Sequence, residues 1–196
     1  MAATIPFPLE LVTERLVIRS PTAADAPLLC EAVAESIEEL RPWMPWADHV
    51  PSLTEAEENC ARAVKRFQDG EDFQVRFFLR ETGLFLGGSG LHRVDWSVPK
   101  FEIGYWVRRS HSGQGYVTET VAKLTRFAFE ELAAERVEIR TSTRNVKSWR
   151  VPERLGFNLE GILHSDMRNL DGSLRDTKVY AKTRDAWPRA DAQTKR

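Results

Sequence analysis

The sequence has few cysteines and no long apolar run. Cys30 and Cys60 stand far apart, with no Cys-x-x-Cys pair and no histidine beside either of them. This spacing argues against a zinc site and favours two reduced thiols over a disulfide. The N-terminus lacks a basic segment followed by an apolar run, and no apolar run approaches the ~20 residues that span a bilayer. We therefore expect a cytoplasmic protein without a metal and without a membrane partner.

The chain also lacks an excess of charge of either sign. Its 28 Lys and Arg side chains nearly cancel its 29 Asp and Glu side chains, which leaves a formal net charge of −1. No global field therefore favours nucleic acid, and direct nucleic-acid binding is not expected. With 42% hydrophobic residues, the 196-residue chain can bury a core without disulfides or metals. One domain spanning 1–196 is expected.

Two kinds of hydrophobic period alternate along the chain, without a repeat or a linker that would divide it. Period-two patterns and turn residues predict strands at 9–21 (one strand or a bent pair), 72–80, 84–96, 100–109 and 136–142, and a long hairpin over 158–183 that turns at Asp171-Gly172. Helices are expected at 22–36, 52–70, 115–134 and 145–157, with Thr22 or Asp25 capping the first and Ser52 or Thr54 the second. This order predicts an α+β or α/β domain around a mixed sheet.

A glycine-containing segment, SGQGYV at 112–117, lies between the strand FEIGYWV and a helix. The N–H groups of 113–118 would be the free donors of a helix N-terminus, which suits a phosphate-bearing ligand. The Walker pattern is absent, and the dinucleotide pattern Gly-x-Gly-x-x-Gly fails because Thr118 holds its last position. The stretch GGSG at 87–90 fails in the same way at Arg93. Spacing alone thus leaves a phosphate site and an ordinary turn as equal alternatives.

Several motifs in order resemble one known family. The succession of strand, glycine loop, helix, strand and NVKSWRVPERLGF is similar to the GNAT N-acetyltransferase superfamily, whose members bind acetyl-CoA. The loop motif of that family, Arg/Gln-x-x-Gly-x-Gly/Ala, falls here on Ser112, Gly115 and Val117, so its first and last residues differ. EIGYWV, GQGYVTE, TERLVIR and the LRPWMPW loop together resemble the RimL/RimJ-like branch, which acetylates the N-termini of ribosomal proteins.

The resemblance implies a mostly antiparallel, twisted central sheet flanked by helices, with an acetyl-CoA-binding core at about residues 100–160. The strand YWVRR would be splayed from its neighbour, so that its backbone receives the pantetheine arm. The implied acetyl-CoA-binding residues are Trp106, Val107, Arg108, Ser112, Gly113, Gln114, Gly115, Tyr116, Val117, Thr118, Asn145 and Ser148.

Two residues are candidates for the chemistry. By resemblance, Glu102 is a general base for the acceptor amine; the alternative is a strand carboxylate paired with an arginine. Ser148 either belongs to a capping pair with Asn145, or donates a hydrogen bond to the departing CoA sulfur while Asn145 holds the pantetheine arm. Pro152 removes the N–H that would bond the Ser148 carbonyl, so we expect a bend or a 3₁₀ turn there.

Other side chains are expected to be structural first. Trp43, Met44 and Trp46 form either core or lid, or by resemblance border the acceptor groove. The isolated histidines are interpreted as surface or core residues: His49, His92, His111 and His164.

The function expected is transfer of an acetyl group from acetyl-CoA to a primary amine in a direct ternary complex. By resemblance, the acceptor is the α-amine of a protein or peptide. The alternatives are a small-molecule amine, such as an antibiotic, polyamine or amino acid, and a CoA-binding regulatory module without turnover. The family also implies a possible homodimer through the C-terminal hairpin.

Overall fold

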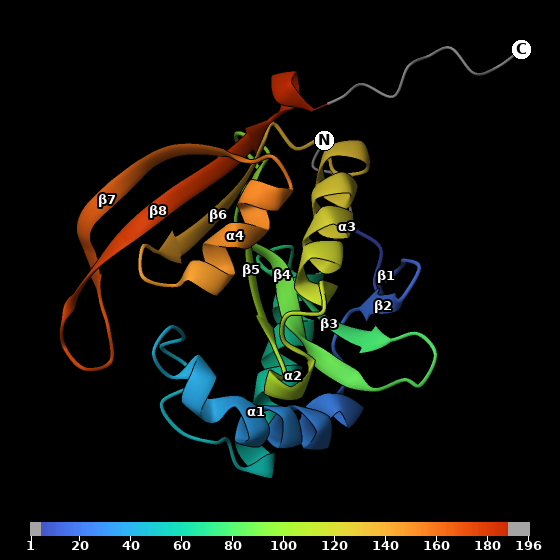
Figure 1. Ribbon diagram of the computed structural model, residues 1–196. Helices are drawn as coiled ribbons and strands as arrows, with labels where there is room; N and C mark the ends of the chain where they lie inside the picture. Colours follow the sequence, from blue (N-terminus) through green and yellow to red (C-terminus); the bar gives the residue numbers. More distant parts are fainter. Residues whose placement is uncertain (1–4, 188–196) are drawn as a thin grey trace, which may run out of the picture.

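Eight strands form one continuous sheet in the computed structural model, which describes residues 5–187 (Figure 1). In spatial order they are β1 (Glu10–Val12), β2 (Leu16–Arg19), β3 (Phe73–Leu79), β4 (Phe85–Asp95), β5 (Lys100–Val107), β6 (Arg136–Ser142), β8 (Leu174–Thr183) and β7 (Asn158–Arg168). All neighbours pair antiparallel except β5 and β6. The expected fold class, a mostly antiparallel sheet flanked by helices, is confirmed.

Helices cover both faces of this sheet. They are α1 (Ala26–Leu40), α2 (Leu53–Gln68), α3 (Tyr116–Glu130) and α4 (Val146–Arg154), with 3₁₀ turns η1 (Ala23–Asp25), η2 (Arg109–His111) and η3 (Arg184–Ala186). The main core lies between the sheet and α3, where Val121 and Leu124 pack with Phe101 and Ile103 of β5. A second cluster joins α1 and α2 on the other side (Figure 1). The strand β5 is therefore covered by helices on both of its faces.

The first helix differs from its expected bounds at both ends. It was expected over 22–36, but a 3₁₀ turn occupies its start and α1 runs from Ala26 to Leu40. The Asp25 carboxylate accepts the Thr22 N–H at 2.8 Å and pairs with Arg19, which tightens the first turn. At the other end, α1 continues to Leu40, a buried residue that was assigned to the start of the predicted loop.

The other helix and hairpin predictions agree with the structure to within a few residues. Ser52 caps α2 in a capping box, in which its Oγ accepts the Glu55 N–H and the Glu55 carboxylate accepts the Ser52 N–H. Gly70 follows α2 with a φ of 74°. The predicted turn at 171–172 joins β7 to β8, a long hairpin that reaches past the other strands (Figure 1).

The strands β5 and β6 separate after a short parallel contact. They pair only over Lys100–Glu102 and Arg136–Glu138, whereas β6 pairs with β8 along its whole length. The rest of β5, from Ile103 to Val107, therefore has an open edge on the β6 side. This is the splay that the resemblance implied.

Three further facts concern the described part of the chain. None of its helices is both long and apolar enough to cross a bilayer. Within residues 5–187, no group of three or more His, Cys, Asp or Glu side chains is arranged to hold a metal ion. Cys30 and Cys60 are free thiols, and the Cys60 side chain is buried.

Candidate active site

The glycine loop presents a row of free N–H groups at the start of α3. Gly113 and Gly115 have φ values of 80° and 85°, in the left-handed region that disfavours other residues. Within residues 5–187, the N–H groups of 113–118 donate to no backbone or side-chain acceptor, whereas the Glu119 N–H bonds the Gly115 carbonyl. The loop therefore has the geometry of an anion site at a helix N-terminus.

The two departures from the family motif fall outside the glycine turn itself. Ser112 is exposed at the end of η2, and Val117 already lies in the first turn of α3. The Val117 side chain packs against the main core, so it does not point into the loop. Tyr116 and Thr118 are half-buried beside it, and Gln114 is exposed.

An arginine from the turn between β1 and β2 holds this loop. Arg15 donates to the Gln114 carbonyl at 3.1 Å, stacks its guanidinium over the Tyr116 ring and pairs with Glu119. Glu119 also accepts hydrogen bonds from Thr13 Oγ1 and from the Arg15 backbone. Burial acts to raise the pKa of Glu119, but these hydrogen bonds outweigh it and lower the pKa. The loop is thereby fixed before any ligand arrives.

The backbone of β5 alternates between its two neighbours. Arg108 donates its N–H to the Leu86 carbonyl at 2.7 Å, and its carbonyl accepts from His111. Because an antiparallel pair exchanges both bonds at every second residue, Trp106 opposite Gly88 also points its backbone groups toward β4. Tyr105 and Val107 therefore face the open edge. Of the three predicted edge residues, only Val107 keeps backbone groups available there, while the Arg108 side chain is buried in ion pairs with α1.

Tyr105 connects this edge to α4. Its hydroxyl donates to the Ser148 carbonyl at 2.9 Å and accepts from Ser148 Oγ at 3.3 Å. Burial raises the pKa of Tyr105 far above its usual range, so the phenol stays protonated. Of the two expected alternatives at Pro152, a bend or a 3₁₀ turn, the 3₁₀ turn does not form, because α4 is a continuous α-helix from Val146 to Arg154. The Tyr105 hydroxyl gives the Ser148 carbonyl the hydrogen bond that proline cannot.

The predicted capping pair is present at the start of α4. Asn145 is the N-cap, and its Oδ1 accepts the Ser148 N–H at 3.1 Å. The Ser148 side chain takes no part in this cap, so its hydroxyl remains available on the Tyr105 side. The structural and catalytic interpretations of Ser148 therefore concern different atoms.

Glu102 lies at the closed end of the splay. It pairs in register with Glu138 of β6, and one of its oxygens lies 3.3 Å from Arg93 Nε. Burial raises the pKa of Glu102; the Arg93 charge opposes this rise and the Glu138 charge adds to it. Its cross-strand partner on β4 is His92. The alternative, in which Glu102 is a strand carboxylate paired with an arginine, thus has a partner in Arg93. The role of Glu102 as a general base stays a prediction.

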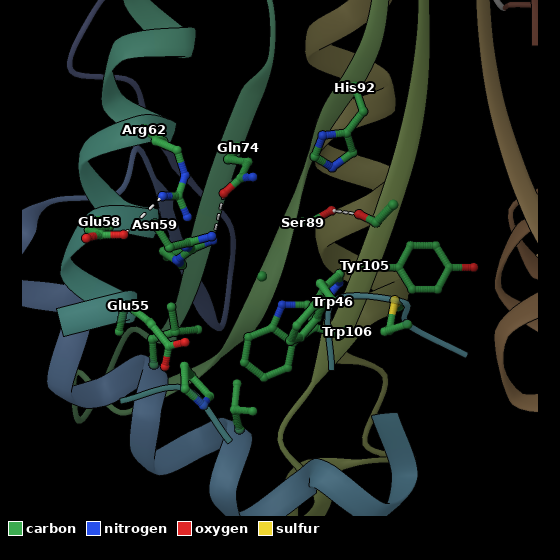
Figure 2. Close-up of a pocket in the computed structure, with 18 of the residues that line it drawn as sticks. Trp46, Glu55, Glu58, Asn59, Arg62, Gln74, Ser89, His92, Tyr105 and Trp106 are labelled. Carbon is green, nitrogen blue, oxygen red and sulfur yellow. Dashed lines mark hydrogen bonds and ion pairs between the residues drawn. The ribbon is translucent and has the colours of Figure 1, made fainter. Parts of the chain in front are cut away.

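A cavity of about 680 Å³ opens on the face of β5 that α1 and α2 cover (Figure 2). It lies between the sheet, these two helices and the loop 40–52. Met44 and Trp46 line it, and the Trp46 ring meets the Trp106 ring edge-on at 5.7 Å. Figure 2 shows Trp106 facing the cavity and the Tyr105 ring directed away from it. Because Tyr105 also borders the cavity, the cavity and the open edge of β5 lie next to each other.

Several cavity residues were given no role in the sequence analysis, His92 among them. His92 was interpreted as isolated, but its Nδ1 lies 3.0 Å from Asp72, and its ring reaches over Gly90 and Gly104. A histidine oriented by a carboxylate can act as a base. The two residues are twenty positions apart on adjoining segments, and only their sheet pairing brings them together. Tyr105, although within the quoted strand motif, was also given no role.

Comparisons with known proteins agree with this geometry. Residues 15–158 match the family described as "Acetyltransferase (GNAT) domain". Over 176 residues the chain is 31% identical to "Putative ribosomal N-acetyltransferase YdaF" of Bacillus subtilis (strain 168), which covers 90% of this chain and 95% of that one. It is 25% identical over 146 residues to "Ribosomal-protein-serine acetyltransferase" of Escherichia coli (strain K12), which covers 74% and 81%.

Solved structures share the fold over nearly the whole chain. A structure of RimL, an alpha-N-protein acetyltransferase in complex with coenzyme A, superposes with a TM-score of 0.83 over 90% of this chain and 98% of that one. At 23% identity, this likeness shows the fold alone.

Proposed function

The chain belongs to the GNAT family of acetyltransferases, and we propose that it transfers the acetyl group of acetyl-CoA to the α-amine of a protein or peptide. The single observation that carries the proposal is the splay beside β5, with a phosphate-type loop at one end and a cavity behind it. The names of the B. subtilis and E. coli relatives support ribosomal proteins as the acceptor class.

The residues fit acetyl-CoA in two places. The free N–H groups of 113–118 suit its pyrophosphate, because backbone donors at a helix start bind anions without a side chain. The open backbone groups of Tyr105 and Val107 suit its pantetheine amides, which pair as a strand would. Bound there, acetyl-CoA supplies the thioester whose acyl group is transferred.

The leaving sulfur is expected near α4. Ser148 Oγ and the Tyr105 hydroxyl form a short chain of donors at the open edge. A hydroxyl is a weak acid, yet a charge-assisted hydrogen bond to a developing thiolate requires no full proton transfer. We assign Ser148 to that contact and Tyr105 to its orientation.

The acceptor amine is expected to enter from the cavity. An α-amine has a pKa of about 7.7–8.0, so part of it is neutral at pH 7 and a modest base suffices. Glu102 keeps that role as predicted, and His92 is a second candidate because it lines the cavity itself. Direct attack of the amine on the thioester fits a strand that has one ligand on each side. Neither Cys30 nor Cys60 lines the cavity as a nucleophile for a covalent intermediate.

Release of free thiol from acetyl-CoA with a panel of acceptors tests this proposal. The panel holds peptides with the N-termini of ribosomal proteins, the same peptides with a blocked α-amine, and small amines. Turnover of the free peptides alone is expected. Turnover of small amines alone would favour the second enzyme hypothesis, and tight CoA binding without turnover would favour a regulatory module. The homodimer also stays a prediction, which the mass of the protein in solution tests.

A further inference from the structure

Arg76 on β3 is a buried cation that contacts no carboxylate within the described residues. Its side chain is 4% exposed and lines the cavity. Nη1 donates to Gln74 Oε1 at 3.4 Å, Nη2 donates to Asn59 Oδ1 at 3.2 Å, and Nε has no partner within the described residues. A buried charge is normally paired, because burial without an opposite charge costs several kcal/mol. A ligand anion would supply the missing charge.

The carboxylates nearest to this arginine are otherwise engaged. Cys60 is the first neighbour that favours the Arg76 charge, but burial raises the pKa of its thiol, so it stays neutral. Asp25 attracts Arg76 through space, but its oxygens bond Arg19 at 2.6 and 2.9 Å. The other cavity-lining cations have acidic partners: Arg62 lies 3.5 Å from Glu58, and His49 bonds Glu55. Arg76 is thus the cation of this cavity that remains uncompensated in the described part of the chain.

Gly88 lets the side chains of Arg76 and Trp106 come together over its backbone. Arg76, Gly88 and Trp106 are neighbours in one row across β3, β4 and β5. A Cβ on Gly88 would lie 2.6 Å from Trp106 Nε1 and 3.3 Å from Arg76 Nη1. Two donors therefore converge above a position that any side chain would fill. Within the GGSG stretch, this contact accounts for Gly88 alone, because Gly87 and Gly90 approach the Trp106 backbone and the His92 ring instead.

The chemistry favours a carboxylate over a dianion. A guanidinium matches the two oxygens of a carboxylate in a planar, bidentate arrangement. One negative charge balances Arg76, whereas a second would meet Glu55 and Glu58, which line the same cavity.

We propose that Arg76, together with the indole N–H of Trp106, forms a subsite for a carboxylate carried by the acceptor amine. This inference rests on the proposed function and names the acceptor more closely. The carboxylate has two possible sources: the side chain of an acidic first residue in a peptide, or the α-carboxylate of a free amino acid.

Matched acceptor pairs test the subsite and separate the two sources. One pair consists of C-terminally amidated peptides that begin with Asp or Asn and are otherwise identical; the other is alanine and alaninamide. We expect the carboxylate member of one pair to have a kcat/KM roughly 10- to 100-fold higher, as a charge-assisted contact would give. Equal kcat/KM values within both pairs would overturn the inference.

Variants then locate the preference. In Arg76→Met the ratio within the preferred pair should fall to about one. Arg62→Met removes a cation from the same cavity that already has a partner, and should leave the ratio unchanged. A ratio that survives in folded Arg76→Met would contradict the assignment.

A binding measurement keeps the inference separate from the proposed function. Calorimetry with CoA present compares the N-acetylated Asp and Asn peptides, and likewise N-acetylalanine and its amide. If no acceptor turns over, the proposed function fails, yet tighter binding of a carboxylate member still supports the subsite. Equal binding within both pairs argues against it, even where Arg76→Met does not fold.

Discussion

The Tyr105 hydroxyl donates a hydrogen bond to the Ser148 carbonyl at 2.9 Å, and this is the carbonyl that Pro152 leaves without its helical donor. Tyr105 of β5 thus supplies a hydrogen bond that α4, on the far side of the splay, lacks. The same hydroxyl accepts from Ser148 Oγ, so one phenol bonds both the carbonyl and the hydroxyl of that serine.

The first prediction concerns the Tyr105 hydroxyl as the donor that replaces the N–H missing at Pro152. Tyr105→Phe should lower the free energy of unfolding by about 1–3 kcal/mol, because a partly buried carbonyl loses its partner. In a Pro152→Ala background the restored N–H can bond the Ser148 carbonyl, so the same change should cost less. Denaturant unfolding of the four proteins gives both costs. Equal costs in the two backgrounds would show that Tyr105 does not replace the helical bond.

The second prediction separates cap from catalysis at Ser148. Because Asn145 Oδ1 bonds the Ser148 backbone, Ser148→Ala should leave stability nearly unchanged, whereas Asn145→Ala should cost about 1 kcal/mol. If Ser148 Oγ meets the leaving sulfur, Ser148→Ala lowers turnover roughly 10- to 100-fold, from ~1.5–3 kcal/mol. The measurement is a single-turnover rate at saturating acetyl-CoA. A parental rate would leave Ser148 a structural residue.

Patterns within one segment predicted most of the fold. Alternation assigned the strand of residues 136–142 with its observed bounds, and a capping pattern placed Ser52 at the start of α2. Interactions between segments were not predictable in this way. The first helix begins after Asp25, one of its two predicted caps, and the bond from Arg19 of a neighbouring strand to Asp25 was not foreseen. Nor was the hydrogen bond from Tyr105 of β5 to the Ser148 carbonyl, which lacks its helical donor at Pro152.

The same distinction, between patterns within one segment and interactions between segments, applies to the candidate site. The loop at 113–118 was visible because its donors are consecutive in sequence. The cavity was not, since Arg76, Gly88 and Trp106 come from three strands and meet only through sheet register. Register also decides which backbone groups face the splay, and it removed Arg108 from the predicted edge.

The third prediction tests the glycine loop with a matched backbone control. Gly115→Val places a side chain at a φ of 85° and close to Arg15, so it should weaken CoA binding roughly tenfold by displacing phosphate-binding amides. Gly172→Ala creates the same kind of strain at a φ of 81° in the distant β7–β8 turn. Calorimetric titration with CoA should show a loss only for the first. Unchanged affinity in folded Gly115→Val would remove the phosphate assignment.

The fourth prediction concerns Glu102 as a base. In the pH range between the raised pKa of Glu102 and the pKa of the acceptor amine, the fraction of neutral amine decreases as the pH falls. A base then matters more, so Glu102→Gln should reduce kcat by a larger factor at the acidic end of this range. The pH profiles of the two enzymes give this ratio. A constant ratio would mean that Glu102 only positions the acceptor, and His92→Ala tests the second candidate in the same assay.

The last prediction uses the same carboxyl as a probe of stability. Burial, opposed by Arg93 and aided by Glu138, raises the pKa of Glu102 in the folded protein above its unfolded value. The folded state therefore binds this proton more tightly, and Glu102 destabilises it increasingly as the pH rises above the unfolded pKa, with the full effect above the folded pKa. Glu102→Gln should raise the melting temperature at pH 7, and the gain should vanish near pH 4, about the unfolded pKa. Glu160→Gln is the control of opposite sign, because the hydrogen bond from Arg136 lowers the pKa of Glu160 and makes its charge stabilising at pH 7. A melting temperature of Glu102→Gln that stays below the parental value at pH 7 would show that the pairing with Arg93 outweighs the burial of this carboxylate.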